Sequence, residues 1–268
     1  KRELKKGDVI EIANGSDTTE TFQSSTEEVP FTRVEDENYW NGSLHVYIPG
    51  VNGVRTTKTG DVSGITLVED TQPVVNEEYK IYNANVGDDK VIALTFDDGP
   101  WPDSTGQILD ILDQYDAKAT FFVLGKNVEA YPDLFRRIVD AGHKVGNHTY
   151  SHQKGWGMSL ERYIEDVDFA NDLIHSELFR PPYARITPAQ ARALSQRYKL
   201  VMWDVLSRDY SRSLSPRKCL KNVTKHLEPG AIVVFHDSEK SFRNMRYALP
   251  RTLDKIRKLG LKCKTIEL

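Results

Sequence analysis

The segment Val91-Ile-Ala-Leu-Thr-Phe-Asp-Asp-Gly-Pro100 decides the fold class. Its mostly apolar, strand-favouring residues run directly into two adjacent carboxylates and a Gly-Pro break, which is typical of a buried strand in an α/β fold. Catalytic groups in such folds collect at the carboxyl ends of strands, where Asp97 and Asp98 lie. Neighbouring side chains of a strand point in different directions, so one carboxylate could hold a metal while the other faces the reacting group. A capped strand-to-helix turn would also explain Asp-Gly-Pro, and the rest of the chain has to decide between the two interpretations.

Downstream of this segment, strand patterns and helix patterns alternate to the end of the chain. The segments between the strands have helical patterns and typical helix starts, such as Ser159, Thr187 and Pro216. Strands that alternate with helices predict a parallel sheet, either open or closed into a barrel. The seven predicted strands are residues 91–96, 119–124, 144–148, 177–179, 199–205, 231–236 and 263–266.

The N-terminal part of the chain has a different pattern. Residues 1–85 contain short strand candidates separated by Asn-Gly and Thr-Gly turns, without a helical pattern of useful length. They carry 8 Lys and Arg against 15 Asp and Glu, whereas residues 86–268 carry 28 against 24. We therefore predict two modules, a small all-β module at 1–85 and an α/β domain at 86–268.

Composition narrows the class of protein. No run of about 18 apolar residues is present, so no transmembrane segment is expected. The start Lys1-Arg-Glu-Leu-Lys-Lys lacks the pattern of a signal peptide, as the start of a mature protein would. The basic excess after residue 85 is too small and scattered to predict nucleic acid binding. Cys219 and Cys263 fit neither a disulfide framework nor a cysteine-based zinc site, and we expect two separate buried thiols.

A candidate metal site combines the first predicted strand end with the third. His148 and His152 are four residues apart, which on a helical turn places both imidazoles on one face. Asp98 would supply a third ligand, and such a set leaves coordination positions open for water and substrate. Imidazole and carboxylate ligands suit Zn²⁺, Co²⁺, Mn²⁺ or Fe²⁺, and the sequence does not choose between these metals. Two surface or capping histidines are the alternative interpretation.

Arg180 and His236 follow two further predicted strands. The two prolines after Arg180 fix the backbone and remove two donors, which suits an arginine held against a carboxylate. The next available N–H, that of Tyr183, could donate to an oxyanion. His236 is a candidate general acid that Asp209 could hold and polarise. A proline-rich turn and an ordinary strand-end histidine would explain the same residues if each were taken alone.

These segments together resemble a known family. In order and spacing, they are similar to the five motifs of polysaccharide deacetylases of the NodB-homology type, carbohydrate esterase family 4. The resemblance covers residues 86–268 and implies a distorted (β/α)7 barrel. The segments are Thr95-Phe-Asp-Asp-Gly-Pro100, His148-Thr-Tyr-Ser-His152, Arg180-Pro-Pro-Tyr183, Asp209-Tyr210 and the strand that ends at His236.

The resemblance implies a role for each motif residue. The implied reaction is metal-assisted hydrolysis of an acetamide, in which a base takes a proton from water and an acid protonates the leaving amine, so we expect a bell-shaped pH profile. The implied roles are: general base, Asp97; metal ligands, Asp98, His148 and His152; positioning of the base, Arg180; backbone oxyanion donor, Tyr183; general acid and its partner, His236 and Asp209; pocket for the acetyl methyl group, Val234.

Three features depart from the family pattern. Ala184 stands where the family usually has glycine, and it would strain the turn if that position needs a positive φ. Tyr210 replaces the commoner tryptophan and would reshape one wall of the groove. The link from the helix that ends near His175 to Glu177 is very short, so either the turn is unusually tight or residues are missing from the chain.

The implied substrate is a polymer or oligomer of N-acetylglucosamine, with peptidoglycan first and chitin-type chains second. Trp101, Trp156 and Tyr210 lie near the motifs and could stack on sugar faces, or they could pack at the rim. Family members that remove O-acetyl groups from xylan share the motifs, so an esterase remains an alternative. A non-catalytic glycan-binding protein at the cell surface is another.

The N-terminal module also resembles a known family. Val29-Pro-Phe and Gly50-Val-Asn-Gly-Val-Arg-Thr-Thr57 are similar to the G5 domain, an extracellular β module of bacterial surface proteins. This resemblance covers roughly residues 20–80 and implies a role in wall or glycan association, with a simple spacer as the alternative. We accordingly expect an extracellular or cell-wall-associated protein, and a monomer.

Overall fold

The computed structural model describes residues 20–33, 44–82 and 90–267. The chain divides by its contacts into two units. The first comprises Lys1–Asp36 and Tyr47–Tyr79, and the second comprises Glu37–Val46 and Lys80–Leu268. The segment before residue 47 that belongs to the second unit contributes most of an edge strand to its sheet, as described below.

The described part of the first unit is a three-stranded antiparallel sheet. Its strands are β1 (Phe22–Val29), β3 (Gly53–Gly60) and β4 (Thr66–Gln72), in the order β1-β3-β4. Most of their side chains are exposed, so backbone ladders and surface polar pairs hold the sheet together. One such pair joins Arg55 Nε to Asp70 Oδ1 at 2.8 Å across β3 and β4. The described residues before residue 83 form strands only, as predicted, but by their contacts residues 44–46 and 80–82 belong to the second unit, whereas the sequence placed them in the first module.

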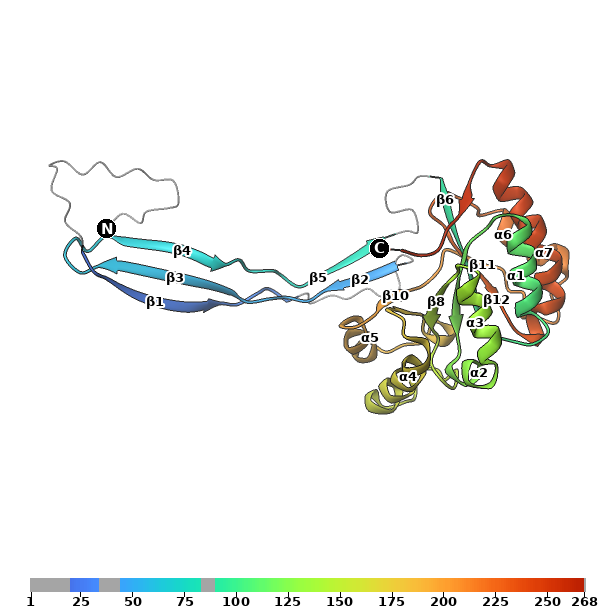
Figure 1. The fold of residues 1–268 in the computed structure, drawn as a ribbon, viewed down its shortest axis with the longest axis horizontal. Helices are drawn as coiled ribbons and strands as arrows, with labels where there is room; N and C mark the ends of the chain where they lie inside the picture. The colour runs from blue at the N-terminus through green and yellow to red at the C-terminus, as the bar shows by residue number, and fades with distance from the viewer. Residues whose placement is uncertain (1–19, 34–43, 83–89, 268) are drawn as a thin grey trace. The chain divides into compact units, whose positions relative to one another are not determined.

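The second unit is built on seven parallel strands (Figure 1). Their order in the sheet is β11-β12-β6-β7-β8-β9-β10, and every neighbouring pair is parallel. At one edge, β2 (Leu44–Ile48) pairs antiparallel with β10, and β5 (Glu78–Tyr82) follows it; β13 (Lys262–Cys263) pairs with the start of β6. The parallel strands are β6 (Val91–Asp97), β7 (Ala119–Val123), β8 (Lys144–Asn147), β9 (Leu178–Phe179), β10 (Lys199–Val201), β11 (Val205–Leu206) and β12 (Ile232–His236).

The single strand predicted at 199–205 was wrong, because the structure divides it into β10 and β11. These two strands lie at opposite ends of the parallel series, so the link at 202–204 joins its two edges and the sheet curls into a distorted barrel. The carbonyl groups of Val201 and Met202 accept hydrogen bonds from Arg180, at 3.1 and 3.0 Å, rather than from a neighbouring strand. The predicted (β/α)7 barrel is confirmed.

Helices cover the outside of this sheet (Figure 1). Figure 1 shows α1, α6 and α7 along one flank, and α4 and α5 together at another. Between β7 and β8 the structure has two helices, the short α2 and α3. The helices are α1 (Thr105–Gln114), α2 (Gly125–Ala130), α3 (Pro132–Asp140), α4 (Leu160–Ile174), α5 (Pro188–Ser195), α6 (Pro216–Thr224) and α7 (Glu239–Lys258).

Alternation along β6 explains how the sheet positions polar groups. All seven residues of β6 are buried. Ile92, Leu94 and Phe96 belong to the main core, in which the Phe96 ring stacks on those of Phe121 and Phe235 at 5.0 and 6.0 Å between centroids. Because side chains alternate between the two faces of a strand, Thr95 and Asp97 point to the opposite face, inside the barrel. The same periodicity that builds the core therefore delivers Asp97 to the interior.

The short link before β9 is a tight turn. His175 caps α4 in the left-handed conformation, with φ at 53° and its N–H bonded to Asn171 O, a position that glycine usually occupies. The Ser176 hydroxyl then donates to Val145 O at 2.8 Å and accepts from Leu178 N at 3.0 Å. These bonds connect the helix to the strand without further residues.

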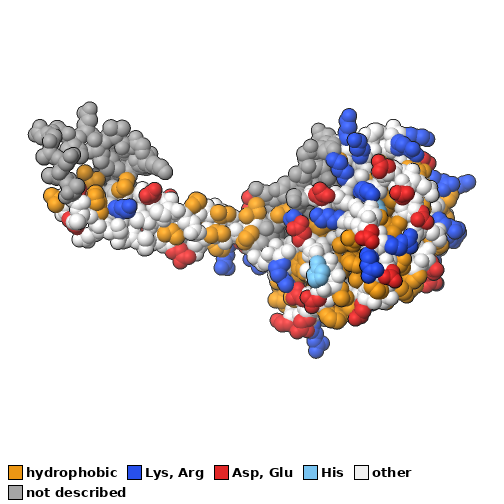
Figure 2. Space-filling view, viewed as in Figure 1, with side chains coloured by type: hydrophobic (Ala, Val, Ile, Leu, Met, Phe, Trp, Pro, Cys, Tyr) orange, Lys and Arg blue, Asp and Glu red, His pale blue; other side chains and the backbone are white. Residues whose placement is uncertain are grey.

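The surface of the second unit carries both signs of charge. On the face shown in Figure 2, Lys and Arg side chains are interspersed with Asp and Glu. Both Cys219 and Cys263 are free thiols, as expected, but only Cys219 is buried, whereas Cys263 is partly exposed. Among the described residues, no helix has the length and apolar character that spanning a membrane requires.

Candidate active site

The centre of the site is a buried ion pair between Asp97 and Arg180. Arg180 begins after β9 and is fully buried, and its Nη1 donates to Asp97 Oδ1 and to Thr95 Oγ1, both at 2.7 Å. The guanidinium carbon lies 4.0 Å from the centroid of the Phe122 ring. With the two carbonyls at residues 201 and 202, every guanidinium nitrogen donates a hydrogen bond, as a buried charge requires. Arg180 therefore holds the Asp97 carboxylate in one orientation.

Asp98 leaves the strand in a different direction. Its φ of 80° turns the chain, and its backbone is held by Asp98 N to Phe122 O at 3.2 Å and by Asn127 Nδ2 to Asp98 O at 2.7 Å. Asp98 Oδ1 then lies 3.1 Å from His152 Nε2 and 3.7 Å from His148 Nε2. The two neighbouring carboxylates therefore face different partners, as the strand geometry predicted.

The two histidines meet in an irregular loop, so the expected helical turn was wrong. Thr149 and His152 both have a left-handed backbone, with φ at 68° and 64°. Asn147 Oδ1 accepts from Thr149 N at 2.8 Å, and Thr149 Oγ1 accepts from His152 N at 3.0 Å. These side-chain bonds stabilise the unusual backbone and bring the imidazole rings to 5.3 Å between centroids.

Asp98, His148 and His152 fit a divalent metal. The Arg180 carbonyl accepts from Nδ1 of His148 at 2.7 Å, which leaves the Nε2 lone pair toward Asp98. Burial lowers the pKa of His148 to about 4, so this ring is the neutral ligand form. Asp98 Oδ1 is buried without a hydrogen-bond partner, which a cation would satisfy. One ligand atom from each of the three residues lies within 4.8 Å of the others.

The pKa of Asp98 agrees with this arrangement. Burial by itself would raise that pKa. The His152 imidazole, whose Nε2 lies 3.1 Å from Oδ1, and the charge of the protonated His236 outweigh burial and hold the pKa of Asp98 well below its ordinary value. The carboxylate is therefore ionised, as a ligand must be.

The turn after Arg180 presents an unpartnered backbone donor. Tyr183 and Ala184 both have positive φ, at 59° and 54°. The N–H groups of Ala184 and Arg185 bond to Pro181 O and Pro182 O, whereas the Tyr183 N–H finds no acceptor in the described part of the chain. The strain expected for Ala184 is therefore present, because alanine occupies the left-handed region.

His236 is the last residue of β12, and Asp209 holds its imidazole ring. The Asp209 carboxylate, fully buried, accepts from His236 Nδ1 and from its backbone N–H, both at 2.8 Å. Burial would lower the pKa of His236, but the Asp209 charge and hydrogen bond outweigh it and raise the pKa to about 9. The imidazole is therefore protonated at neutral pH and keeps Nε2 free to donate. The ring of Tyr210 packs edge-on against it at 4.9 Å.

Asp237, a further buried carboxylate that is absent from the predicted site, shapes the loop that carries Asp97 and Asp98. Asp237 accepts from the hydroxyls of Ser104 and Thr105, the latter at 2.6 Å, and its N–H donates to Asp97 O at 2.7 Å. Burial raises the pKa of Asp237 to about 7. A Cβ on Gly99 would lie 2.3 Å from Asp237 Oδ2, so only glycine fits at that position.

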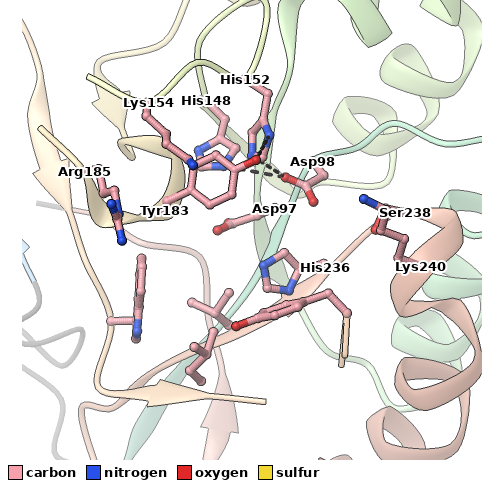
Figure 3. A pocket seen from close by; sticks show the side chains of 14 residues that line it. Asp97, Asp98, His148, His152, Lys154, Tyr183, Arg185, His236, Ser238 and Lys240 are labelled. Carbon is pink, nitrogen blue, oxygen red and sulfur yellow. Dashed lines mark hydrogen bonds and ion pairs between the residues drawn. The ribbon is translucent and has the colours of Figure 1, made fainter. Parts of the chain in front are cut away.

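These groups surround one cavity of about 410 Å³ (Figure 3). Figure 3 shows the Asp97 and Asp98 carboxylates between the histidines of the loop and His236. The apolar wall consists of Trp203, Leu206, Val234 and Tyr210, and the rim carries Lys154, Arg185 and Lys240.

Two predicted sugar-stacking residues do not line this cavity. Trp101 packs edge-on against Tyr131, at 6.1 Å between ring centroids. Trp156 is 49% exposed and lies under the guanidinium of Arg185, at 4.6 Å from its ring centroid. Tyr210 and Val234 do line the cavity.

Sequence reasoning missed the remaining lining residues. Lys154 and Arg185 each follow a motif by two positions, and Lys240 follows His236 by four. Their short distance in sequence from the motifs is the feature that could have predicted that they line the cavity. Trp203 and Leu206 were missed because the sequence predicted one continuous strand at 199–205, which does not indicate that this segment reaches the cavity.

Comparisons with known proteins identify the family. The family model for polysaccharide deacetylase matches residues 84–202. A peptidoglycan-N-acetylglucosamine deacetylase of Bacillus cereus is 33% identical over 66% of this chain and 87% of its own length. The chain belongs to the polysaccharide deacetylase family.

Two further comparisons agree with this family. Another Bacillus cereus peptidoglycan-N-acetylglucosamine deacetylase is 37% identical over 55% of the chain, and the match spans only 56% of that protein. The structure of a family 4 carbohydrate esterase from Streptomyces lividans, in complex with acetate, is 30% identical with a TM-score of 0.61. That match covers 66% of this chain and 93% of the Streptomyces chain. The family is metal-dependent, which agrees with the ligand set above.

Proposed function

We propose that this deacetylase hydrolyses the N-acetyl group of N-acetylglucosamine residues in a glycan, with peptidoglycan first and chitin-type oligomers second. One observation carries the proposal: a single cavity is lined by a fixed carboxylate, a three-ligand set and a protonated imidazole, with the Tyr183 turn beside them. The apolar wall that includes Val234 offers a place for the acetyl methyl group.

Asp98, His148 and His152 would hold one divalent metal, with Zn²⁺ favoured over Co²⁺, Mn²⁺ and Fe²⁺. Their two nitrogens and one oxygen match a catalytic zinc set that leaves a position open. The bound ion would polarise the amide carbonyl and lower the pKa of water.

The chain's own residues would supply the proton transfers. Asp97 would take a proton from the attacking water, while Arg180 prevents the carboxylate from turning away. The unpartnered N–H of Tyr183 would stabilise the oxyanion. As the C–N bond breaks, His236 would donate its Nε2 proton to the leaving amine, and Asp209 would compensate the charge of the imidazolium. The products are acetate and a free amino sugar.

Acetate release tests the proposal. The metal-loaded chain should release acetate from chitooligosaccharides and peptidoglycan, and a chelator or Asp97→Asn should abolish the release. Asp97→Asn must retain its metal content and circular dichroism, so that loss of the base is measured alone. Glycan binding without acetate release would favour the binding-protein alternative. Release from acetylxylan but from no N-acetylated glycan would favour the esterase.

The location of action and the N-terminal module are part of the proposal. We propose that the protein acts outside the cell at the wall, as a monomer, and that residues 1–85 form a G5-like accessory module. The relatives named for peptidoglycan support a wall substrate.

Removing residues 1–85 would take β2 away from β10, so the module is better tested by a point change. Phe22, 52% exposed on β1, is suitable: Phe22→Ala should weaken wall binding, and unchanged binding would favour a spacer.

A further inference from the structure

Three cations on the rim of the cavity have no assigned role. Lys154 follows the histidine loop, Arg185 follows the Tyr183 turn, and Lys240 lies in the first turn of α7; all three are exposed and line the cavity. We refer to Lys154, Arg185 and Lys240 as the cationic rim. Figure 3 shows Lys154 and Arg185 on one side of the central carboxylates and Lys240 on the other.

The cationic rim has no acidic partner within the described ranges. No carboxylate in them lies within 4.0 Å of a charged nitrogen of Lys154, Arg185 or Lys240. The two carboxylates of the cavity are already engaged, Asp97 by Arg180 and Asp98 by the imidazoles. The positive charge at the rim is therefore available to a ligand.

Two of the three cations are held in place by aromatic rings. Lys154 Nζ lies 5.0 Å from the centroid of the Tyr183 ring, and the Arg185 guanidinium lies 4.6 Å from that of Trp156. Such contacts orient a cation without neutralising its charge. A cation oriented in this way loses less entropy when it binds an anion.

Backbone bonds connect the two loops that carry these cations. Gly155 N donates to Arg185 O at 2.8 Å, and Trp156 Nε1 donates to Ile186 O at 3.1 Å. A Cβ on Gly155 would lie 2.7 Å from Arg185 O, so the loops approach as closely as glycine allows. Lys154 and Arg185 therefore belong to one connected structure at the cavity edge.

We propose that the cationic rim selects glycans that carry a carboxylate near the reacting N-acetylglucosamine over neutral glycans. The inference rests on the proposed function and specifies its substrate class. A neutral oligomer would fill the cavity and meet the catalytic groups, but it would leave the rim without a partner. A carboxylate one sugar away, or on a peptide attached to that sugar, would pair with the rim and add affinity.

Each cation of the rim should change substrate affinity only modestly, and the three together should change it by a measurable factor. An exposed ion pair changes a binding constant by a factor of roughly 1.5 to 5, so three pairs of about twofold each together give about tenfold. Because exposed charges are screened over about 8 Å at physiological ionic strength, the preference should shrink as salt is added.

The test compares substrates on the full, metal-loaded chain. Acetate release is measured at 20 and 500 mM NaCl, as KM and kcat, on three substrates: neutral chitopentaose, peptidoglycan strands stripped of peptides, and strands with peptides attached. The variants are Lys154→Gln, Arg185→Gln, Lys240→Gln and the triple change. Arg185→Lys should rescue most of the effect of Arg185→Gln. Lys218→Gln, an exposed cation of α6 that does not line the cavity, is the matched control.

We expect the triple change to lower the ratio of kcat/KM on carboxylate-bearing strands to that on chitopentaose about tenfold, mainly through KM. A preference for stripped strands alone would assign the carboxylate to the sugar, because the amide bond to the peptide removes that carboxylate in peptide-bearing strands. A preference for peptide-bearing strands alone would assign it to the peptide, and a preference for both kinds of strand would mean that the rim accepts either carboxylate. A ratio unchanged by the variants and by salt would overturn the inference while leaving the deacetylase activity established. No acetate from any substrate would instead refute the proposed function.

Discussion

Replacing Asp209 by asparagine removes the charge that keeps His236 protonated. The carboxylate accepts from Nδ1 and from the backbone N–H of His236, and its Oδ1 also accepts from Tyr210 N at 3.0 Å. Asparagine has nearly the same size but only one acceptor oxygen. The substitution therefore tests charge and hydrogen bonding with little change in packing.

The magnitude follows from the pKa of His236. That pKa is raised from 6.5 to about 9, a difference equivalent to about 3 kcal/mol. Without Asp209, burial should return it to about 6.5 or lower, so the protonated fraction at pH 7.5 falls from about 97% to about 9%. At pH 6 the same change costs less than about twofold. The ratio of wild-type to variant kcat/KM should therefore grow about eightfold or more between pH 6 and pH 7.5.

The assay is acetate release from chitopentaose across pH 5 to 10. A loss of kcat/KM that is the same at every pH would indicate that the His236 ring is misplaced. A loss that grows with pH would indicate that the pKa of His236 has fallen. A bound cation would shift the pKa of His236 in both proteins, and comparing wild type with the variant cancels this shift. Asp168→Asn, which removes a surface carboxylate paired with Arg197 at 2.9 Å, should leave the alkaline limb in place.

Stability gives an independent readout of the same pair. Because the folded-state pKa of His236 lies above the unfolded value, its contribution to stability is complete below about pH 6.5 and is lost as pH rises through about 9. The stability difference between wild type and Asp209→Asn should shrink over that window in urea titrations. An alkaline limb at the same pH in both proteins would refute our assignment of Asp209 as the group that sets the pKa of His236.

Three further predictions concern the turn, the buried ion pair and the metal. Ala184→Gly should raise the free energy of unfolding by about 1 kcal/mol, because glycine adopts positive φ without the alanine penalty; urea titration measures this, and a lower stability would contradict it. Arg180→Met should cost about 3–5 kcal/mol and most of the activity, because it leaves the Asp97 charge buried alone; a melting temperature equal to that of wild type would count against a buried pair. A chelator should abolish acetate release with unchanged circular dichroism, Zn²⁺ should restore it, and His152→Ala should reduce the bound metal found by elemental analysis; full activity of metal-free protein would exclude the ligand assignment.

Much of the domain could be read from the sequence because the information is local. The nearly continuous apolar runs at 91–96 and 231–236 predict buried strands, since strands of a parallel sheet are covered on both faces. Helix starts such as Ser159 and Thr187 are side-chain caps, and both accept the expected backbone bond. Because parallel strands end on one rim, the motifs after them were correctly expected to meet. Asp97, Asp98, His148 and His236 lie around one cavity for that reason.

What only the tertiary structure decided depends on partners far apart in the chain. The segment at 199–205 has the pattern of one strand, but a guanidinium 19 residues before its start and pairing with β9 and β12 divide it in two. The histidine loop is irregular because Asn147 and Thr149 replace helical bonds with side-chain ones. Likewise the charge of His236 depends on the burial of Asp209, and the cationic rim exists only because two loops are bonded together. A sequence pattern records which face a residue prefers, whereas charge state and loop contacts depend on neighbours that the fold supplies.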